Sequence, residues 1–286
     1  MQTRRIADLG VSAIGLGGMP MSIEGRPDEA RSIATIHAAL DAGVTLFDTA
    51  DSYHLHADDV GHNESLIARG LASWGGDTSH VLVATKGGHL RPGDGTWTVD
   101  GRPEHLKAAA EASLQRLGGD AIGLYQFHRP DPAVPYADSV GAIRDLLDAG
   151  TIRLAGISNA NPEQILLAQE ILGGRLASVQ NQFSPAFRSS APELELCDRL
   201  GIAFLPWSPL GGIASAAGLG TRFAPFQVIA DEHGVSPQVV CLAWHLAKSP
   251  HVIPIPGASR PASIHDSVSA VDLTLTDDEL ATLDRV

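Results

Sequence analysis

Four polar residues stand at or just beyond the ends of three short apolar runs, and together they could deliver a proton to a substrate oxygen. They are Asp48 and Tyr53 in FDTADSYH, Lys86 in VLVATKGG and His128 in IGLYQFHRP. A phenol with a pKa of about 10 is a weak acid at neutral pH, but a neighbouring ammonium favours the phenolate and lowers that pKa. We expect Lys86 to supply this charge to Tyr53, and Asp48 to keep the lysine protonated. A histidine such as His128 would orient the substrate oxygen, so the combination predicts carbonyl reduction.

These residues need a scaffold that brings several strand ends together. Short apolar runs alternate with helical patterns along the chain, which is typical of a parallel sheet made of βα units. Eight such units in a chain of 286 residues predict an α/β fold, a (β/α)8 TIM barrel forming a single domain over residues 1–286. The reacting groups of such barrels lie at the C-terminal ends of the strands. The eight strands are expected at residues 13–16, 44–47, 81–84, 122–127, 153–157, 178–180, 202–206 and 252–255.

Several helices have recognisable first residues. Asp28, Asn161 and Ser236 precede helical stretches and are residue types that cap a helix N-terminus. Thr276 and Glu279 have the spacing of a capping box before the last helix. These positions predict where four of the helices begin.

A long connection directly follows Lys86. Residues 87–102 are rich in Gly, Pro and Asp, and a loop of this length usually serves a site. We expect it to form a flap on the substrate side, above a pocket for an apolar or aromatic carbonyl compound. The residues expected to line that pocket are Met19, Met21, His89, Trp97 and Phe187.

Composition narrows the range of partners. Residues of hydrophobic type make up 44% of the chain, and the net charge is -13, from 33 acidic and 20 basic side chains. An acidic protein repels nucleic acid and anionic membranes, so neither is an expected partner. No apolar run approaches the ~18 residues of a membrane span. The two cysteines lie far apart in segments that read as helices, which favours free thiols and a cytoplasmic location.

The order of the four polar residues, with a step of five from Asp48 to Tyr53, resembles that of the aldo-keto reductase family. Further similar segments run through almost the whole chain: NES at 63–65, GISN at 156–159, Gln180 in VQNQFS, WSPLGG at 207–212 and IPGAS at 255–259. Each segment alone is a weak signal, and their joint order makes the likeness specific. The resemblance implies an NAD(P)H-dependent reductase of small carbonyl substrates, with Tyr53 as the acid, and we expect it to be a monomer or to associate weakly. It also implies that the opening residues form a β-hairpin that closes the bottom of the barrel.

The usual glycine fingerprint of a nicotinamide-binding Rossmann domain is incomplete. Gly15, Gly17 and Gly18 begin such a pattern, but Pro20 stands where its last glycine should be. The barrel loops must therefore bind the cofactor. By resemblance, the carboxamide is held by Ser158, Asn159 and Gln180, the nicotinamide stacks on Trp207, and the pyrophosphate passes Ser208, Pro209, Leu210 and Gly212.

The adenosine end of the cofactor departs most from the family pattern. The resemblance places it against Gly257, Ser259 and the residues that follow, where Arg260 is the only nearby cation. Ser263 occupies the place of the usual arginine, and Asp266 and Ser267 replace the usual Glu and Asn. Arginine binds phosphate through two parallel hydrogen bonds, so Arg260 favours NADPH over NADH.

Two other functions fit parts of the sequence. His54 and His56 form an HxH pattern, which begins the metal site of some barrel hydrolases. Its place in an acidic loop, well beyond the strand end, argues against a catalytic metal, and we expect none. The second alternative is a nucleotide-binding sensor subunit with slow turnover, because some barrels similar to this one act in that way.

Overall fold

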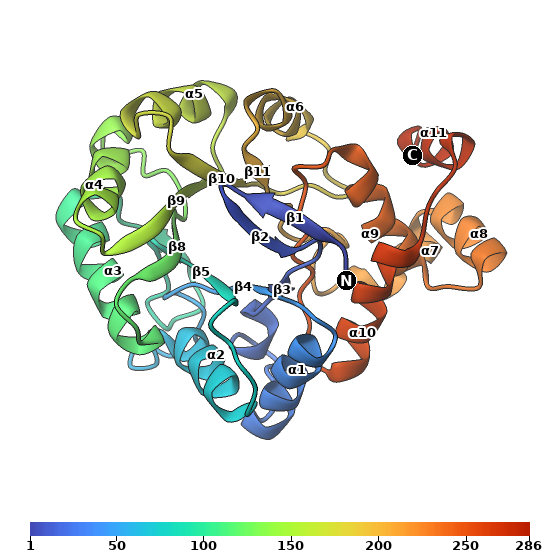
Figure 1. Ribbon diagram of the computed structural model, residues 1–286, viewed down its shortest axis with the longest axis horizontal. Helices are drawn as coiled ribbons and strands as arrows, with labels where there is room; N and C mark the ends of the chain where they lie inside the picture. The colour runs from blue at the N-terminus through green and yellow to red at the C-terminus, as the bar shows by residue number, and fades with distance from the viewer.

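The computed structural model describes residues 1–286 and has a central ring of parallel strands surrounded by helices (Figure 1). Seven strands are hydrogen-bonded in the order β3-β4-β5-β8-β9-β10-β11, and all neighbouring pairs are parallel. This arrangement confirms the predicted (β/α)8 barrel. The strands are β3 (Leu16–Gly17), β4 (Leu46–Asp48), β5 (Leu82–Gly87), β8 (Ile122–Phe127), β9 (Ile152–Ser158), β10 (Leu176–Gln180) and β11 (Ala203–Phe204).

The eighth position of the barrel is not a regular strand, which corrects the strand expected at residues 252–255. Its backbone still joins both neighbours. The amide of Ile253 donates to the carbonyl of Phe204 at 2.9 Å, and the amide of Gly15 donates to the carbonyl of Pro254 at 3.0 Å. The carbonyls of Pro254 and Pro256 accept hydrogen bonds from the amides of Gly15 and Gly17. Neither proline has an N–H, so neither donates a hydrogen bond in return. The barrel is therefore closed by an incomplete ladder.

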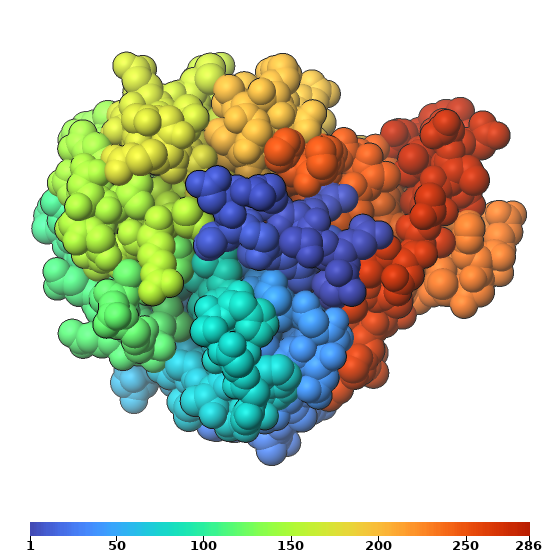
Figure 2. All heavy atoms as spheres, in the orientation of Figure 1, coloured from blue at the N-terminus to red at the C-terminus, as the bar shows by residue number.

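An antiparallel hairpin covers one end of the barrel. Its strands are β1 (Thr3–Ile6) and β2 (Leu9–Ser12). Ile6 and Val11 are buried in one cluster with residues such as Leu46, which begins its barrel strand. The hairpin therefore lies at the N-terminal ends of the strands, and Figure 2 shows it filling the middle of that face. This confirms the predicted closure of the bottom.

Helices alternate with the barrel strands and pack outside them (Figure 1). The ring is formed by α1 (Glu29–Asp41), α2 (His62–Ser73), α3 (Pro103–Leu117), α4 (Tyr136–Asp148), α5 (Pro162–Ile171), α6 (Ala191–Leu200), α9 (Pro237–Lys248) and α10 (Pro261–Ser269). Three more helices, which lie beside α9, are α7 (Leu219–Arg222), α8 (Ala224–His233) and α11 (Asp277–Asp284). Short 3-10 turns occur at η1 (Met19–Met21), η2 (Ala216–Gly218) and η3 (Ala270–Asp272). No helix has the length and apolar character needed to cross a bilayer.

The expected helix starts are confirmed. The carboxylate of Asp28 accepts the amide of Arg31 at 2.8 Å, and the Ser236 hydroxyl accepts the amide of Val239 at 3.1 Å. Asn161 and Thr276 each form a complete capping box. These caps fix the entry of the chain into α1, α5, α9 and α11, and so help to set the loops that precede them.

Candidate active site

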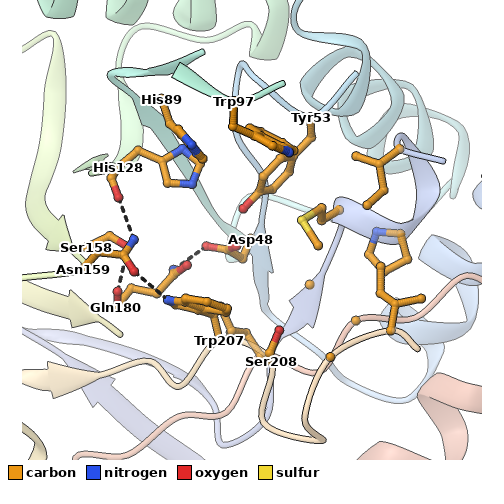
Figure 3. Close-up of a pocket in the computed structure, with 18 of the residues that line it drawn as sticks. Asp48, Tyr53, His89, Trp97, His128, Ser158, Asn159, Gln180, Trp207 and Ser208 are labelled. Atoms are coloured by element: carbon orange, nitrogen blue, oxygen red, sulfur yellow. Dashed lines mark hydrogen bonds between the residues drawn. The ribbon is translucent and has the colours of Figure 1, made fainter. Parts of the chain in front are cut away.

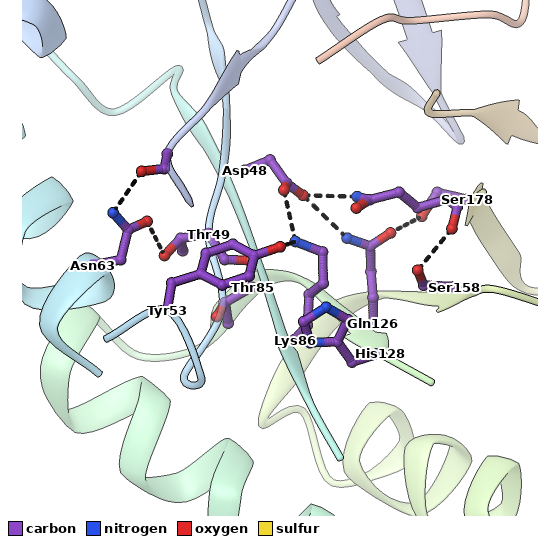
Figure 4. Close-up of polar contacts among 12 residues, drawn as sticks. Asp48, Thr49, Tyr53, Asn63, Thr85, Lys86, Gln126, His128, Ser158 and Ser178 are labelled. Atoms are coloured by element: carbon purple, nitrogen blue, oxygen red, sulfur yellow. Dashed lines mark hydrogen bonds and ion pairs between the residues drawn. The ribbon is translucent and has the colours of Figure 1, made fainter. Parts of the chain in front are cut away.

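Lys86 is the centre of a buried polar cluster at the C-terminal ends of β4 and β5. Its side chain is fully buried, and Nζ donates to Asp48 Oδ1 at 2.6 Å, to the Thr49 carbonyl at 2.8 Å and to the Tyr53 hydroxyl at 3.1 Å (Figure 4). An ammonium has three donors, so all of them have an acceptor. Burial by itself lowers the pKa of Lys86, but the Asp48 charge and Tyr53 raise that pKa above its ordinary value. The lysine is therefore charged at neutral pH.

The second oxygen of Asp48 is held by two amides. Gln180 Nε2 donates to Oδ2 at 2.8 Å, and Gln126 Nε2 lies 3.4 Å from the same atom. With only 3% of its surface exposed, Asp48 is fixed on both sides by hydrogen bonds. Gln126 comes from β8 and was not expected at the site. Gln180, which was expected to hold the cofactor, is thus bonded to Asp48 and helps to orient it.

Tyr53 keeps its proton more tightly than the sequence predicted. Burial raises the pKa of Tyr53 above its ordinary value, and this effect outweighs the lowering by the Lys86 charge. The expected net lowering was therefore wrong, because the cost of placing a phenolate in a dry site is not visible in the sequence. A protonated hydroxyl that already accepts a hydrogen bond from an ammonium is ready to donate its own proton to a third group.

His128 lies beside Tyr53. The two rings meet edge to face with centroids 5.8 Å apart, and Nδ1 of His128 is buried with no hydrogen-bond partner. Burial, together with the Lys86 charge, lowers the pKa of His128 well below its usual range. The imidazole is therefore neutral, and it can offer one N–H donor to a substrate oxygen.

A cavity of about 730 Å³ opens over these residues (Figure 3). Asp48, Tyr53 and His128 line it, whereas Lys86 lies beneath its wall. Most residues expected at the cofactor also line it: Ser158, Asn159, Gln180, Trp207, Ser208, Pro209, Leu210, Gly212 and Gly257. The structure thus places the proposed acid and most of the expected cofactor residues around one space.

The wall expected to hold the carboxamide is a connected polar group (Figure 3). Ser158 Oγ donates to the Gln180 carbonyl at 2.7 Å, and Asn159 Nδ2 donates to the His128 carbonyl at 3.0 Å. Trp207 Nε1 in turn donates to Asn159 Oδ1 at 3.2 Å. Asn159 is held in the left-handed region with φ 57°, a strained conformation for a residue other than glycine. This wall presents fixed polar atoms beside a flat indole, which suits an amide-bearing aromatic ring.

The loop after Trp207 lines the cavity and has free backbone donors. Ser208 and Gly212 have φ values of 49° and 97°, which turn the chain sharply. Leu210, Gly212 and Ile213 line the cavity, and their amide groups donate to no group of the chain. Unpaired amides in such a turn form a concave anion site, so this loop fits a pyrophosphate.

The remaining expected cofactor residues lie outside the cavity. Arg260 is exposed, and its Nε donates to Ser263 Oγ at 2.9 Å. Ser259 accepts the side chain of Arg31 through its carbonyl at 3.0 Å, so a second arginine, from α1, lies at this end. Ser267 is buried against the barrel. Arg31 was missed by the sequence analysis, because nothing in its surroundings marks it as a neighbour of Ser259.

The flap predicted at residues 87–102 contains a small hairpin of β6 (His89–Leu90) and β7 (Thr98–Val99). His89 and Trp97 from this hairpin line the cavity, and their rings are stacked with centroids 4.7 Å apart. The guanidinium of Arg91 lies 4.9 Å from the centre of the Trp97 ring and also pairs with Glu24. The flap is thus connected to the rest of the site by the contact of His89 with His128 and by the ion pair of Arg91 with Glu24.

Two residues expected in the substrate pocket do not line it. Met21 is fully buried in the core with residues of α1 and α2. Phe187 is 37% exposed and lies outside the cavity. Met19, His89 and Trp97, by contrast, are in the lining as expected.

The HxH segment forms a structural turn. Nδ1 of His54 lies 2.7 Å from the carbonyl of His56, and the His54 carbonyl accepts Arg91 Nη1 at 2.5 Å. No group of three or more His, Cys, Asp or Glu side chains is arranged to hold a metal ion. The alternative hydrolase therefore lacks a set of ligands at His54 and His56.

A second buried acidic group lies behind the site. Glu64 is fully buried, pairs with Arg116 Nε at 2.5 Å and accepts Thr85 Oγ1. Asp51 lies in the same region, with Oδ1 buried and without a partner. Burial, reinforced by the Glu64 charge, raises the pKa of Asp51 to about 8. Asp51 is therefore mainly protonated at neutral pH.

Comparison with known proteins agrees with this geometry. A model of the Aldo/keto reductase family matches residues 13–286. The chain belongs to this family. It is 32% identical over 287 residues to an oxidoreductase of Schizosaccharomyces pombe, covering 99% of this chain and 89% of the relative. It is also 32% identical over 273 residues to a 6-dehydroglucose reductase of Novosphingobium aromaticivorans, covering 92% of this chain and 87% of the relative.

The structural comparison gives the same family. The glycerol dehydrogenase from Gluconobacter oxydans superposes with a TM-score of 0.83 at 27% identity, over 99% of this chain and 94% of that one. This aldo-keto reductase is therefore an oxidoreductase that reduces carbonyl groups with a nicotinamide cofactor.

Proposed function

We propose that this aldo-keto reductase reduces aldehydes or ketones to alcohols with NADPH, and that Tyr53 protonates the substrate oxygen. The observation that supports this most directly is the contact of 3.1 Å between Lys86 Nζ and the Tyr53 hydroxyl, at the edge of the large cavity. When bound, the cofactor supplies a hydride to the carbonyl carbon. The carbonyl oxygen then becomes basic, and a positioned acid must neutralise it.

The raised pKa values of Tyr53 and Lys86 suit this proton transfer together. Because burial keeps Tyr53 protonated, the enzyme starts each cycle with its acid loaded. As the proton leaves, the negative charge on the phenolate forms beside an ammonium that Asp48 holds in place. The cost of making a buried phenolate is therefore offset at the moment when it arises. His128 is neutral, and we propose that it orients the substrate oxygen toward Tyr53.

NADPH is the cofactor that the charges favour. Arg260 and Arg31 both lie at the Ser259 end, where the resemblance places the adenosine. No carboxylate pairs with either guanidinium, so both are free to bind a phosphate. We also propose that the active form is a monomer.

Cofactor oxidation tests the proposal. The purified protein should oxidise NADPH in the presence of small aldehydes, and Tyr53→Phe should lower kcat by about 10²- to 10⁴-fold, the usual contribution of a general acid. NADPH affinity, followed by quenching of tryptophan fluorescence, should change little. Tyr136→Phe is the matched control, because its buried hydroxyl has no partner and lies outside the cavity.

Two results would contradict the proposal. Turnover that persists in Tyr53→Phe would remove Tyr53 from the role of acid. Tight nucleotide binding with no reduction of any aldehyde would instead support a nucleotide sensor. The cofactor preference is tested separately, since Arg260→Ala should weaken NADPH more than NADH, and equal losses would dismiss the phosphate contact.

A further inference from the structure

The charges of the residues that line the cavity do not cancel. There are three: Glu24, Asp48 and Arg129. Glu24 forms an ion pair with Arg91, and Asp48 forms one with Lys86, so both carboxylates are neutralised by cations behind the wall. The cavity therefore keeps one positive charge, that of Arg129, although the chain as a whole carries a net charge of -13.

Arg129 is an unpaired arginine that lines the same cavity as the proposed proton donor, Tyr53. It directly follows His128 at the end of β8 and is only partly exposed. Its Nε is buried without a hydrogen-bond partner, and its guanidinium forms no ion pair or hydrogen bond with any group of the chain. A buried donor without an acceptor is costly, so a site that keeps one is incomplete until an acceptor binds.

The positive charge of Arg129 lies near the two histidines of the cavity, His89 and His128. The Arg129 charge contributes to lowering the pKa of both His89 and His128, after the larger effect of burial. The two imidazoles meet edge to face with centroids 4.9 Å apart, and His128 is in turn 5.8 Å from the Tyr53 ring. Arg129, both histidines and Tyr53 line the same cavity, so the guanidinium is placed to reach a small molecule whose oxygen contacts Tyr53.

We propose that Arg129 binds an acidic group of the substrate, so that the substrate is an aldehyde or ketone that also carries a carboxylate or phosphate. This inference rests on the proposed reductase function and assigns its substrate class. A guanidinium matches the two oxygens of such a group with parallel hydrogen bonds. His89 has neutral nitrogens with no partner in the chain, and it can add a hydrogen bond to the same group.

The cofactor phosphates have other donors. The free amides of the loop at residues 210–213 belong to the connection after β11, whereas Arg129 follows β8. These two strands are separated by β9 and β10 around the barrel. Arg129 is therefore on the side of the flap and the histidines, where the substrate enters.

Matched pairs of substrates test the role of Arg129. The pair for carboxylate is 4-oxobutanoate and butanal, and the pair for phosphate is glyceraldehyde 3-phosphate and glyceraldehyde. Wild type should have the higher kcat/KM for the acidic member of one pair, which also shows which anion it prefers. Arg129→Gln should lower that value by about 10- to 100-fold, mainly through KM, the usual loss for a charged hydrogen bond. The neutral member should change by less than about threefold, and Arg129→Lys should recover part of the loss.

Arg153→Gln is the control for the loss of one positive charge. Arg153 is exposed on β9 near the end opposite to the site, so its replacement should leave both substrates unchanged. Product binding gives a readout that needs no turnover. With NADP⁺ present, 4-hydroxybutanoate or glycerol 3-phosphate should bind more weakly to Arg129→Gln than to wild type, and butanol or glycerol equally to both.

Three outcomes would overturn the inference: no preference of wild type for either acidic substrate, equal losses for acidic and neutral members in Arg129→Gln, or a rise confined to the KM for NADPH. The last would assign Arg129 to the cofactor. Failure of wild type to reduce any of the four carbonyl compounds would instead count against the reductase function, and the product-binding comparison would still decide whether Arg129 holds an anion.

Discussion

Breaking the buried pair of Asp48 and Lys86 should cost far more stability than removing both charges. The pair is joined at 2.6 Å, and the side chains are 4% and 0% exposed. Removing one partner of such a pair usually costs about 3–5 kcal/mol, because the other charge stays buried without compensation, whereas an uncharged pair of similar volume is often nearly neutral. Lys86→Met and Asp48→Asn should therefore each lose about 3 kcal/mol or more of unfolding free energy, whereas the double variant, which buries no charge, should lose only about 1 kcal/mol or less.

The two sides of the pair should differ in their pH dependence. In wild type the pKa of Lys86 is raised, so its contribution is fully present below the unfolded value of about 10.4 and is lost as pH rises through the folded value. In Asp48→Asn the lysine keeps its burial but loses the carboxylate, and its folded pKa should fall below 10.4. The unfolded state then binds more protons, so the stability of this variant should rise with pH between about 8 and 10.

Urea unfolding of wild type and the three variants, followed by circular dichroism at several pH values, measures these quantities. The slope of free energy against urea must stay constant for the comparison to hold. The reasoning would be refuted if each single variant lost less than about 1 kcal/mol, or if the losses simply added. A stability of Asp48→Asn that falls with pH in the same way as wild type would refute the electrostatic part alone.

Substitutions at three other places test separate features. Asp51→Asn should flatten the pH dependence of stability: with a folded pKa of about 8 against about 3.9 unfolded, the wild-type contribution is present at low pH and declines by up to about 4 kcal/mol as pH rises to 8, which unfolding at pH 5 and pH 8 measures. Thr276→Ala should lose about 1 kcal/mol with the capping box of α11, while Thr276→Ser should retain it in thermal unfolding. Gly18→Ala would place a methyl group 2.4 Å from Asn63 Oδ1 and should lose about 1–3 kcal/mol, whereas Gly141→Ala, in open space inside a helix, should gain up to about 1 kcal/mol.

Much of the barrel and the proposed catalytic group could be predicted because each depends on local patterns. Strand ends follow from short apolar runs, and residues at the ends of neighbouring parallel strands must meet. This places Asp48, Lys86 and His128 together without any knowledge of distances. Helix starts are equally local, as the capping side chains of Asn161 and Thr276 show.

The features that were missed depend on contacts between distant segments. Arg91 pairs with Glu24, and Arg31 reaches Ser259, across separations in sequence that no periodic pattern encodes. The sign of the Tyr53 pKa shift was also missed, since it is decided by how completely the ring is buried. Sequence reasoning identified the groups that interact, but the balance between burial and charge requires the packed structure.

Close approach of the backbone at the eighth barrel position explains the glycines and the proline found there. Gly17 and Gly257 are bridged there, and a methyl group on Gly17 would lie 2.8 Å from the Ile255 carbonyl. A methyl group on Gly257 would lie 2.7 Å from the ring of Pro20, so these two segments of the chain approach too closely for any larger residue. Gly17, Pro20 and Gly257 all line the cavity. This wall is therefore made of backbone rather than side chains, and the residues that it requires are those that fix backbone geometry. Arg129, which follows β8, is not under this constraint, and this agrees with our proposal that it sets the choice of substrate.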